Sequence, residues 1–456
     1  MPWTVDYSIP AMTAAAGFGK VAHLPFIMDS RPGYHRLSSR FLLERGLGKW
    51  HPETRGQTTL TRRIPTPRSI KNYADWLVNF LEWAEMRKLN LTSCDYVDDI
   101  VNGYQKDMEK GKWSRDGKKL SNSTINCRVM LASELLLWMF DKGLRPKFEV
   151  VTIPVAGGNF GKKVKSEVRL GNLRENKRRL RMPSQEELIL WLNSVYRNFG
   201  FTYGLMCESI LTTAMRREEI ACLRVDSLPE DRREWHLKDV DAPFAQQRVL
   251  ITIQYGVKGQ AYGEDHGDKI GPRRDIWIPM HLAERWHAYR SVKGARSAAL
   301  KRRVATTSNI QEKRRRIKES VCLFLDEKTG NRISSKQLYH AWTGGMVPYR
   351  GWSPHRGRDW WSCATLMQEL EERFPREKGF DETTKLHLAG AARDVIRFII
   401  QPQLGHVNEE TTMIYLQWFM DAIARNVTIG YDEELQKYAQ NVYGENGASI
   451  EYPKTQ

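Results

Sequence analysis

The stretch from residue 157 to residue 181 most constrains the fold, because it holds many basic and few apolar side chains. A segment of this composition does not form part of a hydrophobic core. We therefore expect separate domains before and after it in this chain of 456 residues. The basic residues of the stretch are Lys162, Lys163, Lys165, Arg169, Arg174, Lys177, Arg178, Arg179 and Arg181.

This basic linker has two interpretations. It is either a solvated tether or a segment that lies along DNA, where each basic side chain near a phosphate displaces a counterion. The whole chain favours a polyanionic partner, since 71 Lys and Arg outnumber 54 Asp and Glu and give a formal net charge of +17. The candidate DNA-binding residues are Lys162, Lys163, Lys165, Arg169, Arg178 and Arg179.

Before the linker the pattern is helical. Apolar residues recur at three- and four-residue spacing after Thr66-Pro67, which predicts an amphipathic helix there. Two more helices are expected, over Tyr96–Lys110 and from Ser123 to Gly143, so residues 66–148 form a small helical domain. Residues 1–65, with a short helix around 34–46, are a leader that packs on this domain or a DNA-binding arm.

After the linker, residues 149–182, a second domain begins with a capping box. Ser184 can cap a helix and Glu187 can reach back to it. Helices are expected through Tyr196 and over Tyr203–Arg217, and strands over Arg248–Val257 and Asp275–Ile278. From Ser353 the chain is again mostly helical. The predicted fold class is mainly α with a small antiparallel β-sheet (α+β), with a domain over 183–430 and a tail over 431–456.

Several classes of protein do not fit this sequence. The scattered cysteines form no C-x-x-C pair, so neither a zinc ribbon nor a dithiol redox site is indicated, and a reducing compartment is expected. No stretch approaches the roughly 18 apolar residues of a membrane-spanning helix. The first residues lack the basic start and apolar run of a signal peptide. We expect a cytoplasmic protein without a membrane partner.

Three stretches near the C-terminus carry candidate chemistry. They are Thr213–Ile220, Ser353–Arg358 and Leu404–Tyr415, and together they offer two arginines, two histidines and a tyrosine. A guanidinium group can bind two phosphate oxygens at once, and a tyrosine beside a phosphate held in this way can attack phosphorus. Taken alone, each piece has a structural explanation: Arg216 pairs with Glu219 on a helix, and Tyr415 is a core aromatic.

In this order, the three stretches resemble the motifs of the tyrosine recombinase (integrase) family. Thr213–Ile220 resembles T-G-L-R-x-x-E-L, and Ser353–Arg358 resembles T-P-H-x-L-R. Leu404–Tyr415 resembles L-G-H followed by T-T-x-x-Y, with the same spacing from histidine to tyrosine. The resemblance covers about residues 66–425. It implies a helical, SAM-like core DNA-binding domain, a linker and a catalytic domain.

The resemblance also implies a role for each matching residue. Arg216 and Arg358 hold the scissile phosphate, and Glu219 supports the first of them. His355 acts in proton transfer. His406 hydrogen-bonds the phosphate.

Tyr415 is the implied nucleophile, which would hold the DNA through a 3′-phosphotyrosine and free a 5′-hydroxyl. The family also uses a lysine in a β-hairpin turn as general acid. Lys258, after the first predicted strand, fits that place, and Lys269 is the alternative because the turn is long. Neither a metal nor a cofactor is implied.

The sequence departs from the family pattern in four places. Gly357 stands where leucine is usual, and Asp359 stands where a second histidine is common. The turn from Lys258 to Arg274 is long, and residues 367–395 add length between the second and third motifs. These departures concern the residues around Arg358 more than the class of reaction.

The resemblance implies a site-specific recombinase that cuts and rejoins duplex DNA and integrates or excises a mobile element. Its expected partners are two DNA sites bound by a homotetramer at the nucleoid, with accessory DNA-bending or directionality proteins. The tail, with Leu435, Tyr438 and Val442 in one stripe, docks on a neighbouring subunit or packs on its own domain. The alternatives are a relaxing type IB-like topoisomerase, a catalytically silent DNA-binding protein and a metal-dependent nuclease, for which no paired acidic cluster stands out.

Overall fold

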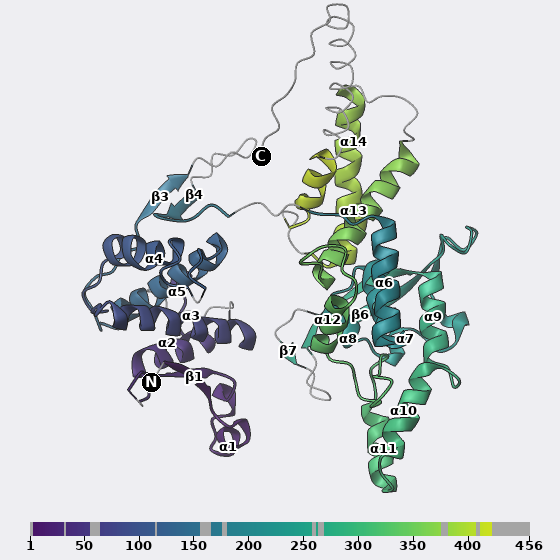
Figure 1. The fold of residues 1–456 in the computed structure, drawn as a ribbon, viewed down its shortest axis with the longest axis horizontal. Helices are drawn as coiled ribbons and strands as arrows, with labels where there is room; N and C mark the ends of the chain where they lie inside the picture. Colours follow the sequence, from purple (N-terminus) through teal and green to yellow (C-terminus); the bar gives the residue numbers. More distant parts are fainter. Residues whose placement is uncertain are drawn as a thin grey trace, which may run out of the picture. The chain divides into compact units, whose positions relative to one another are not determined.

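The structure is a computed structural model that describes residues 3–31, 33–54, 64–114, 116–155, 166–175, 180–257, 261–262, 269–374, 382–406 and 411–421. The chain forms two compact units, Met1–Arg178 and Arg179–Gln456 (Figure 1). The boundary falls inside the segment predicted as a linker.

The first unit is a group of helices with two small hairpins. The first hairpin pairs β1 with β2, and the second pairs β3 with β4, both antiparallel. The elements are β1 (Thr4–Tyr7), α1 (Pro10–Ala15), β2 (Pro25–Met28), α2 (Arg36–Gly46), α3 (Pro67–Met86), the π-helix η3 (Tyr96–Gln105), α4 (Lys106–Glu109), α5 (Asn122–Asp141), β3 (Thr152–Val155) and β4 (Ser166–Arg169), with short 3₁₀ turns at Gly19–Val21 and Pro52–Thr54.

The three helices predicted before the linker are confirmed, and their ends follow from local chemistry. The Thr66 hydroxyl accepts a hydrogen bond from the backbone N–H of Ser69 at 3.2 Å, and Pro67 occupies the first helical position of α3. Ser121 caps α5 in the same way. Gly143 has φ +67°, a left-handed conformation that ends α5 at little cost for glycine.

The first residues of the chain share a hydrophobic core with these helices. Ile27 of β2 and Phe41 of α2 are fully buried in the same cluster as Trp138 of α5. The rings of Phe41 and Trp138 lie 5.9 Å apart, and Trp138 donates to the Glu44 carboxylate at 3.0 Å. The described part of residues 1–65 therefore packs on the helical domain.

Part of the segment predicted as a linker is folded. Strands β3 and β4 lie within it, and Arg169 on β4 makes internal contacts. Its guanidinium donates to Gln105 Oε1 at 3.0 Å and to Asn126 Oδ1 at 2.6 Å, which fixes the strand to the helices. Among the candidate DNA-binding residues, Lys162, Lys163, Lys165, Arg178 and Arg179 lie outside the described residues.

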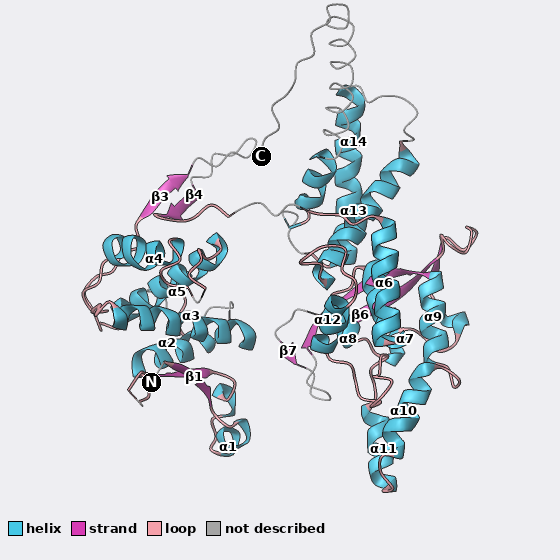
Figure 2. Cartoon of the chain, in the orientation of Figure 1, coloured by secondary structure: helices cyan, strands magenta, loops and turns pink. Residues whose placement is uncertain are grey.

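The second unit is also mainly helical and contains one small antiparallel sheet (Figure 2). The predicted fold class, mainly α with a small antiparallel β-sheet, is therefore confirmed. The sheet has the order β5-β6-β8-β7. Its strands are β5 (Leu237–Lys238), β6 (Arg248–Tyr255), β7 (Ala261–Tyr262) and β8 (Lys269–Pro279). Both predicted strands are present, and β8 begins earlier than expected because its first residues pair with β7.

Several helices of the second unit pack against this sheet. The predicted capping box at Ser184 and Glu187 is present at the start of the first helix. No helix in the described part of the chain has the length and apolar character needed to cross a membrane. The helices are α6 (Gln185–Phe199), α7 (Phe201–Thr213), α8 (Arg217–Ala221), α9 (Met280–Arg290), α10 (Ala295–Ala305), α11 (Ile310–Glu319), α12 (Ser335–Gly344), α13 (Pro354–Arg373), α14 (Glu382–Val395), the π-helix η6 (Ile396–Ile400) and α15 (Gln401–Leu404), with 3₁₀ turns at Val225–Ser227 and Arg232–Glu234.

A cluster of tryptophans joins α6, α12 and the start of α13. The rings of Trp191 and Trp342 lie 4.3 Å apart, and Trp191 donates to the Trp342 carbonyl at 3.0 Å. Trp352 completes the cluster at 5.6 Å from Trp342. All three side chains are fully buried, so this part of the core has little room to rearrange.

This cluster explains why Gly357 departs from the family pattern. A Cβ atom at position 357 would lie 2.6 Å from the Trp342 ring and 3.2 Å from Leu211 Cδ2. The tryptophan ring therefore fills the space that a leucine side chain would need.

We expect Gly357→Ala to destabilise the second unit by about 1–3 kcal/mol, because the added methyl overpacks a ring that cannot move away. The matched control is Gly390→Ala on α14, where a Cβ meets nothing within 4 Å. That change should stabilise the helix by roughly 0.5–1 kcal/mol. Thermal unfolding of both variants checks the pair, and equal stabilisation by the two changes would contradict it.

Candidate active site

A sharp break after α7 places Arg216. The helix predicted over Tyr203–Arg217 ends early, at Thr213, because Ala214 has φ +55° in the left-handed region. The Thr213 hydroxyl then accepts from the backbone N–H of Met215 at 3.3 Å. Arg216 is extended and directly precedes α8, so its side chain leaves the backbone at the start of a new helix.

Glu219, fully buried on α8, is the centre of the site. Its carboxylate accepts from the Arg216 backbone N–H at 2.6 Å and from Arg216 Nη1 at 2.8 Å. Arg274 on β8 binds both carboxylate oxygens, with Nη1–Oε1 at 2.6 Å and Nη2–Oε2 at 2.7 Å. Arg358 Nη1 lies 4.0 Å from Oε2. We call these four residues the arginine cluster.

The arginines keep Glu219 ionised. Burial alone would raise the pKa of this carboxyl, but hydrogen bonds from Arg274 and the charges of Arg216 and Arg358 lower it to about 2. The pairing with Glu219 that the motif allowed for Arg216 is therefore present. The arginine cluster still carries a net positive charge, because three arginines face one carboxylate.

Arg358 is the most deeply buried cation of the cluster. It lies in the first turns of α13, which begins at Pro354 as predicted, and its side chain is 3% exposed. Nη2 donates to the Leu404 carbonyl at 3.0 Å, while Nη1 is buried without a hydrogen-bond partner among the described residues. Burial, together with the charges of Arg216 and Arg274, lowers the pKa of Arg358 to about 10, although Glu219 opposes this.

The short helix α15 brings the third motif against the first. Gln403 accepts from the Trp277 backbone N–H at 3.2 Å and donates to the carbonyls of Trp277 and Thr213 at 2.9 and 3.0 Å. Gly405 then turns the chain with φ +62°, and its carbonyl accepts from Arg216 Nη2 at 3.3 Å. The third motif is thus held to α7, β8 and the arginine cluster.

His406 is a neutral side chain next to these cations. Burial and then the charges of Arg358, Arg216, His355 and Arg274 lower its pKa to about 4. Its Nδ1 lies 3.3 Å from the Thr412 hydroxyl. With the hydroxyl as donor, the ring proton would sit on Nε2, which leaves an N–H for another acceptor.

Tyr415 lies in a helical segment over 413–421, and it is 3% exposed. Its hydroxyl donates to Asp359 Oδ1 at 3.1 Å. Burial and then the negative charge of Asp359 raise the pKa of the phenol above its usual value. The second departure from the family pattern, Asp359, is therefore the hydrogen-bond partner of the predicted nucleophile, and burial together with Asp359 favours the neutral phenol.

The remaining predicted catalytic residues are His355 and Lys258, with Lys269 as the alternative lysine. His355 is exposed in the first turn of α13, and its charge is among those that lower the pKa of His406. Lys258 lies outside the described residues. Lys269 is the first residue of β8, but its side chain also lies outside the description.

Three contacts at the site were missed by sequence reasoning. They involve Arg274, Asp359 as a partner of Tyr415, and Gln403. Arg274 is separated from Glu219 by 55 residues, and Asp359 is separated from Tyr415 by 56. A local pattern cannot reveal such pairs, and the only signal for Arg274 was a charged residue directly before a predicted strand.

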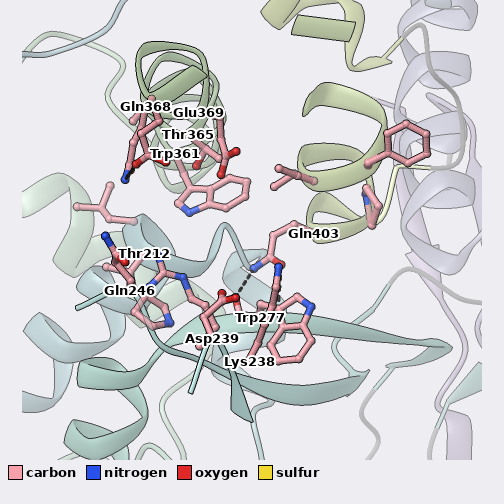
Figure 3. A pocket seen from close by; sticks show the side chains of 18 of the residues that line it. Thr212, Lys238, Asp239, Gln246, Trp277, Trp361, Thr365, Gln368, Glu369 and Gln403 are labelled. Carbon is pink, nitrogen blue, oxygen red and sulfur yellow. Dashed lines mark hydrogen bonds between the residues drawn. The ribbon is translucent and has the colours of Figure 1, made fainter. Parts of the chain in front are cut away.

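A cleft lies between α13, α15 and the sheet. Figure 3 shows Trp361, Thr365 and Gln368 of α13 on one side and Trp277 of β8 on the other, with Gln403 between them. Of the predicted catalytic residues, those that the structure describes do not line this cleft. Within the described residues, no cluster of three His, Cys, Asp or Glu side chains has the arrangement of a metal site.

Comparison of the sequence with protein-family models and with curated proteins gives no match. The structure is similar to the XerH site-specific recombinase bound to palindromic difH substrate, at 16% identity and TM-score 0.44 over 79% of this chain and 80% of that one. It is similar to the Tn1549 transposon integrase with circular intermediate DNA, at 13% identity and TM-score 0.44 over 78% and 90%.

It is also similar to XerA recombinase, at 15% identity and TM-score 0.31 over 87% and 98% of the two chains. These three similar structures are thus two recombinases and a transposon integrase.

The pKa of His406 gives a pH-dependent stability. Its folded value, about 4, lies below the value near 6.5 of an unfolded histidine, so the unfolded chain binds the proton first as the pH falls. His406 should therefore lower the free energy of unfolding as the pH drops from about 6.5 to about 4. Urea unfolding without DNA should show a shallower pH dependence for His406→Gln in this window and parallel curves between about pH 7 and 8. Parallel curves throughout would contradict the assignment.

Proposed function

We propose that this chain is a site-specific tyrosine recombinase that cuts and rejoins duplex DNA through a 3′-phosphotyrosine at Tyr415. The observation that carries the proposal is the arginine cluster. Arg358 keeps a buried Nη1 donor without a hydrogen-bond partner among the described residues, and Tyr415 is bound to Asp359, the residue next to Arg358. A buried cationic donor of this kind is suited to an anion, and a phosphodiester is the anion that a tyrosine can attack.

The charge of the cluster suits one phosphodiester. Three arginines and one ionised glutamate leave two net positive charges, and a phosphodiester brings one negative charge. Negative charge grows on the non-bridging oxygens as phosphorus becomes five-coordinate. Because the guanidinium groups are already held in place by Glu219, Leu404 and Gly405, they stabilise that charge without reorganising.

The proposed reaction consists of two transesterifications. The Tyr415 oxygen attacks phosphorus, the bond from phosphorus to the 5′-oxygen breaks, and the phenolic proton is transferred to His355. Lys258, or Lys269 in its place, protonates the departing 5′-oxygen. In the second step another 5′-hydroxyl attacks the phosphotyrosine and releases Tyr415. One phosphoester replaces another in each step, so neither nucleotide hydrolysis nor a cofactor is needed.

Two further residues have proposed roles before the chemistry. A neutral His406 would donate its Nε2–H to a non-bridging oxygen, since its Nδ1 faces Thr412. Tyr415 would exchange its hydrogen bond to Asp359 for the phosphate when DNA is bound. A neutral phenol is a poor nucleophile, so its proton would have to leave as the oxygen attacks.

The proposed assembly follows the order of domains in the chain. A helical core DNA-binding domain over 66–148 and a catalytic domain over 183–430 would hold the duplex, with the basic segment 149–182 along it. Two sites would be brought together by a homotetramer for integration or excision of a mobile element. The tail over 431–456 would dock on the neighbouring subunit and couple the active sites.

Tyr415→Phe should abolish the covalent DNA complex but leave DNA binding intact, because only the attacking oxygen is lost. Sheared DNA of the genome that encodes the chain serves as substrate. Complexes that survive SDS are isolated by capturing the protein, and the attached DNA is sequenced. Tyr339→Phe, an exposed tyrosine on α12, is the matched control and should behave as wild type. A protease-sensitive, SDS-resistant complex in the Tyr415→Phe protein would show that another residue is the nucleophile.

The same preparation separates the alternatives. A catalytically silent protein gives no SDS-resistant complex, and a metal-dependent nuclease loses its activity in EDTA. A relaxing topoisomerase removes supercoils from any plasmid, whereas the proposed recombinase acts on the recovered sites. Relaxation of a plasmid without these sites would favour the topoisomerase.

The basic segment is tested by salt dependence. Replacing Lys162, Lys163 and Lys165 with glutamine should weaken duplex binding and flatten the plot of log affinity against log salt by about 0.9 for each lost phosphate contact. Arg169 is left unchanged because its guanidinium is engaged with Gln105 and Asn126. An unchanged slope would indicate that the segment is a solvated tether that does not contact DNA.

A further inference from the structure

In the mechanism above Arg274 contributes only its charge, yet it makes a two-point contact with Glu219 at the centre of the arginine cluster. Its two terminal nitrogens bind the two oxygens of Glu219 at 2.6 and 2.7 Å. The Arg274 side chain is 12% exposed and that of Glu219 is not exposed at all. A paired guanidinium–carboxylate contact of this kind is among the stronger charge-assisted interactions in proteins.

The contact matters because Glu219 lies between the two proposed phosphate ligands. Arg216 reaches Glu219 through Nη1, and Arg358 Nη1 lies 4.0 Å from it. Without Arg274, one full negative charge would remain buried between Arg216 and Arg358. That carboxylate would then compete with a phosphate for the donors of both arginines.

A second observation links Arg274 to the third motif. A Cβ atom on Gly405 would lie 2.9 Å from Arg274 Cδ and 3.1 Å from Nε and Nη1. The Arg274 side chain therefore packs against the backbone of Gly405. The carbonyls of Gly405 and its neighbour Leu404 are themselves bound by Arg216 and Arg358. Arg274 thus supports the peptide that both proposed ligands use as an anchor.

We propose that Arg274 is a positioning residue for DNA cleavage. By binding both oxygens of Glu219, it neutralises that carboxylate and leaves the charge and the free donors of Arg216 and Arg358 for the phosphate. Arg274 acts through Glu219 and need not touch the DNA. This inference rests on the proposed function.

The test is a double-mutant cycle on Arg274 and Glu219. The substrate is a nicked suicide duplex made from a site recovered in the genomic DNA experiment, and the rate of covalent complex formation is measured in single turnover. Arg274→Met should lower this rate about 100-fold, the scale of losing one electrostatic contact to a transition state. Duplex affinity should change less than about threefold, because the phosphates outside the site are unaffected.

Rescue separates positioning from a merely structural role. In the Arg274→Met protein, Glu219→Gln should restore the rate at least about tenfold, since it removes the negative charge that Arg274 neutralised. Arg274→Lys, which keeps the charge but loses the paired contact, should fall between wild type and Arg274→Met. The matched control is Arg273→Met, because Arg273 lies next to Arg274 on β8 and is exposed, with its Nε on Gln254 at 3.0 Å.

Each result has one meaning. If the Arg274→Met protein cleaves DNA as fast as the Arg273→Met protein, the inference is overturned. It is also overturned if the Arg274→Met protein folds but Glu219→Gln does not restore its cleavage rate. If Arg274→Met does not fold, the Glu219→Gln protein is compared with the double variant. The two should then cleave within about threefold of each other, because no buried charge remains to neutralise. A much slower double variant overturns the inference. Absence of any covalent complex in wild type would instead contradict the proposed function.

Discussion

The buried charge of Glu219 is the constraint on which the rest of the site depends. Its carboxylate binds a guanidinium from the start of α8 and another from β8, and it lies near a third from α13. An ionised carboxylate cannot stay in a protein interior without such partners, so the three elements are held together by an electrostatic requirement as well as by packing. The third motif joins this arrangement through its carbonyls, which bind Arg216 and Arg358.

Features set by neighbouring residues were predictable from the sequence. The helix start at Thr66-Pro67, the cap at Ser184, the strands β6 and β8 and the start of α13 at Pro354 all follow from patterns a few residues long. The ordered motifs pointed to Arg216, Arg358, His406 and Tyr415 as one group, and the structure brings them together around Glu219 and Asp359.

The rest depends on contacts between distant parts of the chain. Arg274 meets Glu219 because β8 lies against α7 and its neighbour β6 lies against α8, and no local pattern encodes that approach. The departures from the family motif are explained in the same way. The ring of Trp342 requires a glycine at position 357, and Asp359 receives the hydroxyl of Tyr415. Such substitutions are intelligible only together with their partners.

The π-helix η6 sets a limit on how the length of this chain can vary. It joins α14 to α15 without a break, so the three form one continuous rod that ends at Gly405. A π-type turn holds about one residue more than an α-helical turn, and one residue corresponds to roughly 100° of rotation. Removing a residue between Ile396 and Ile400 would turn Gln403 away from Trp277 and carry His406 around the rod with it. The rotational register of this continuous helix, rather than the number of residues between motifs, therefore fixes which way Gln403 and the histidine after it face.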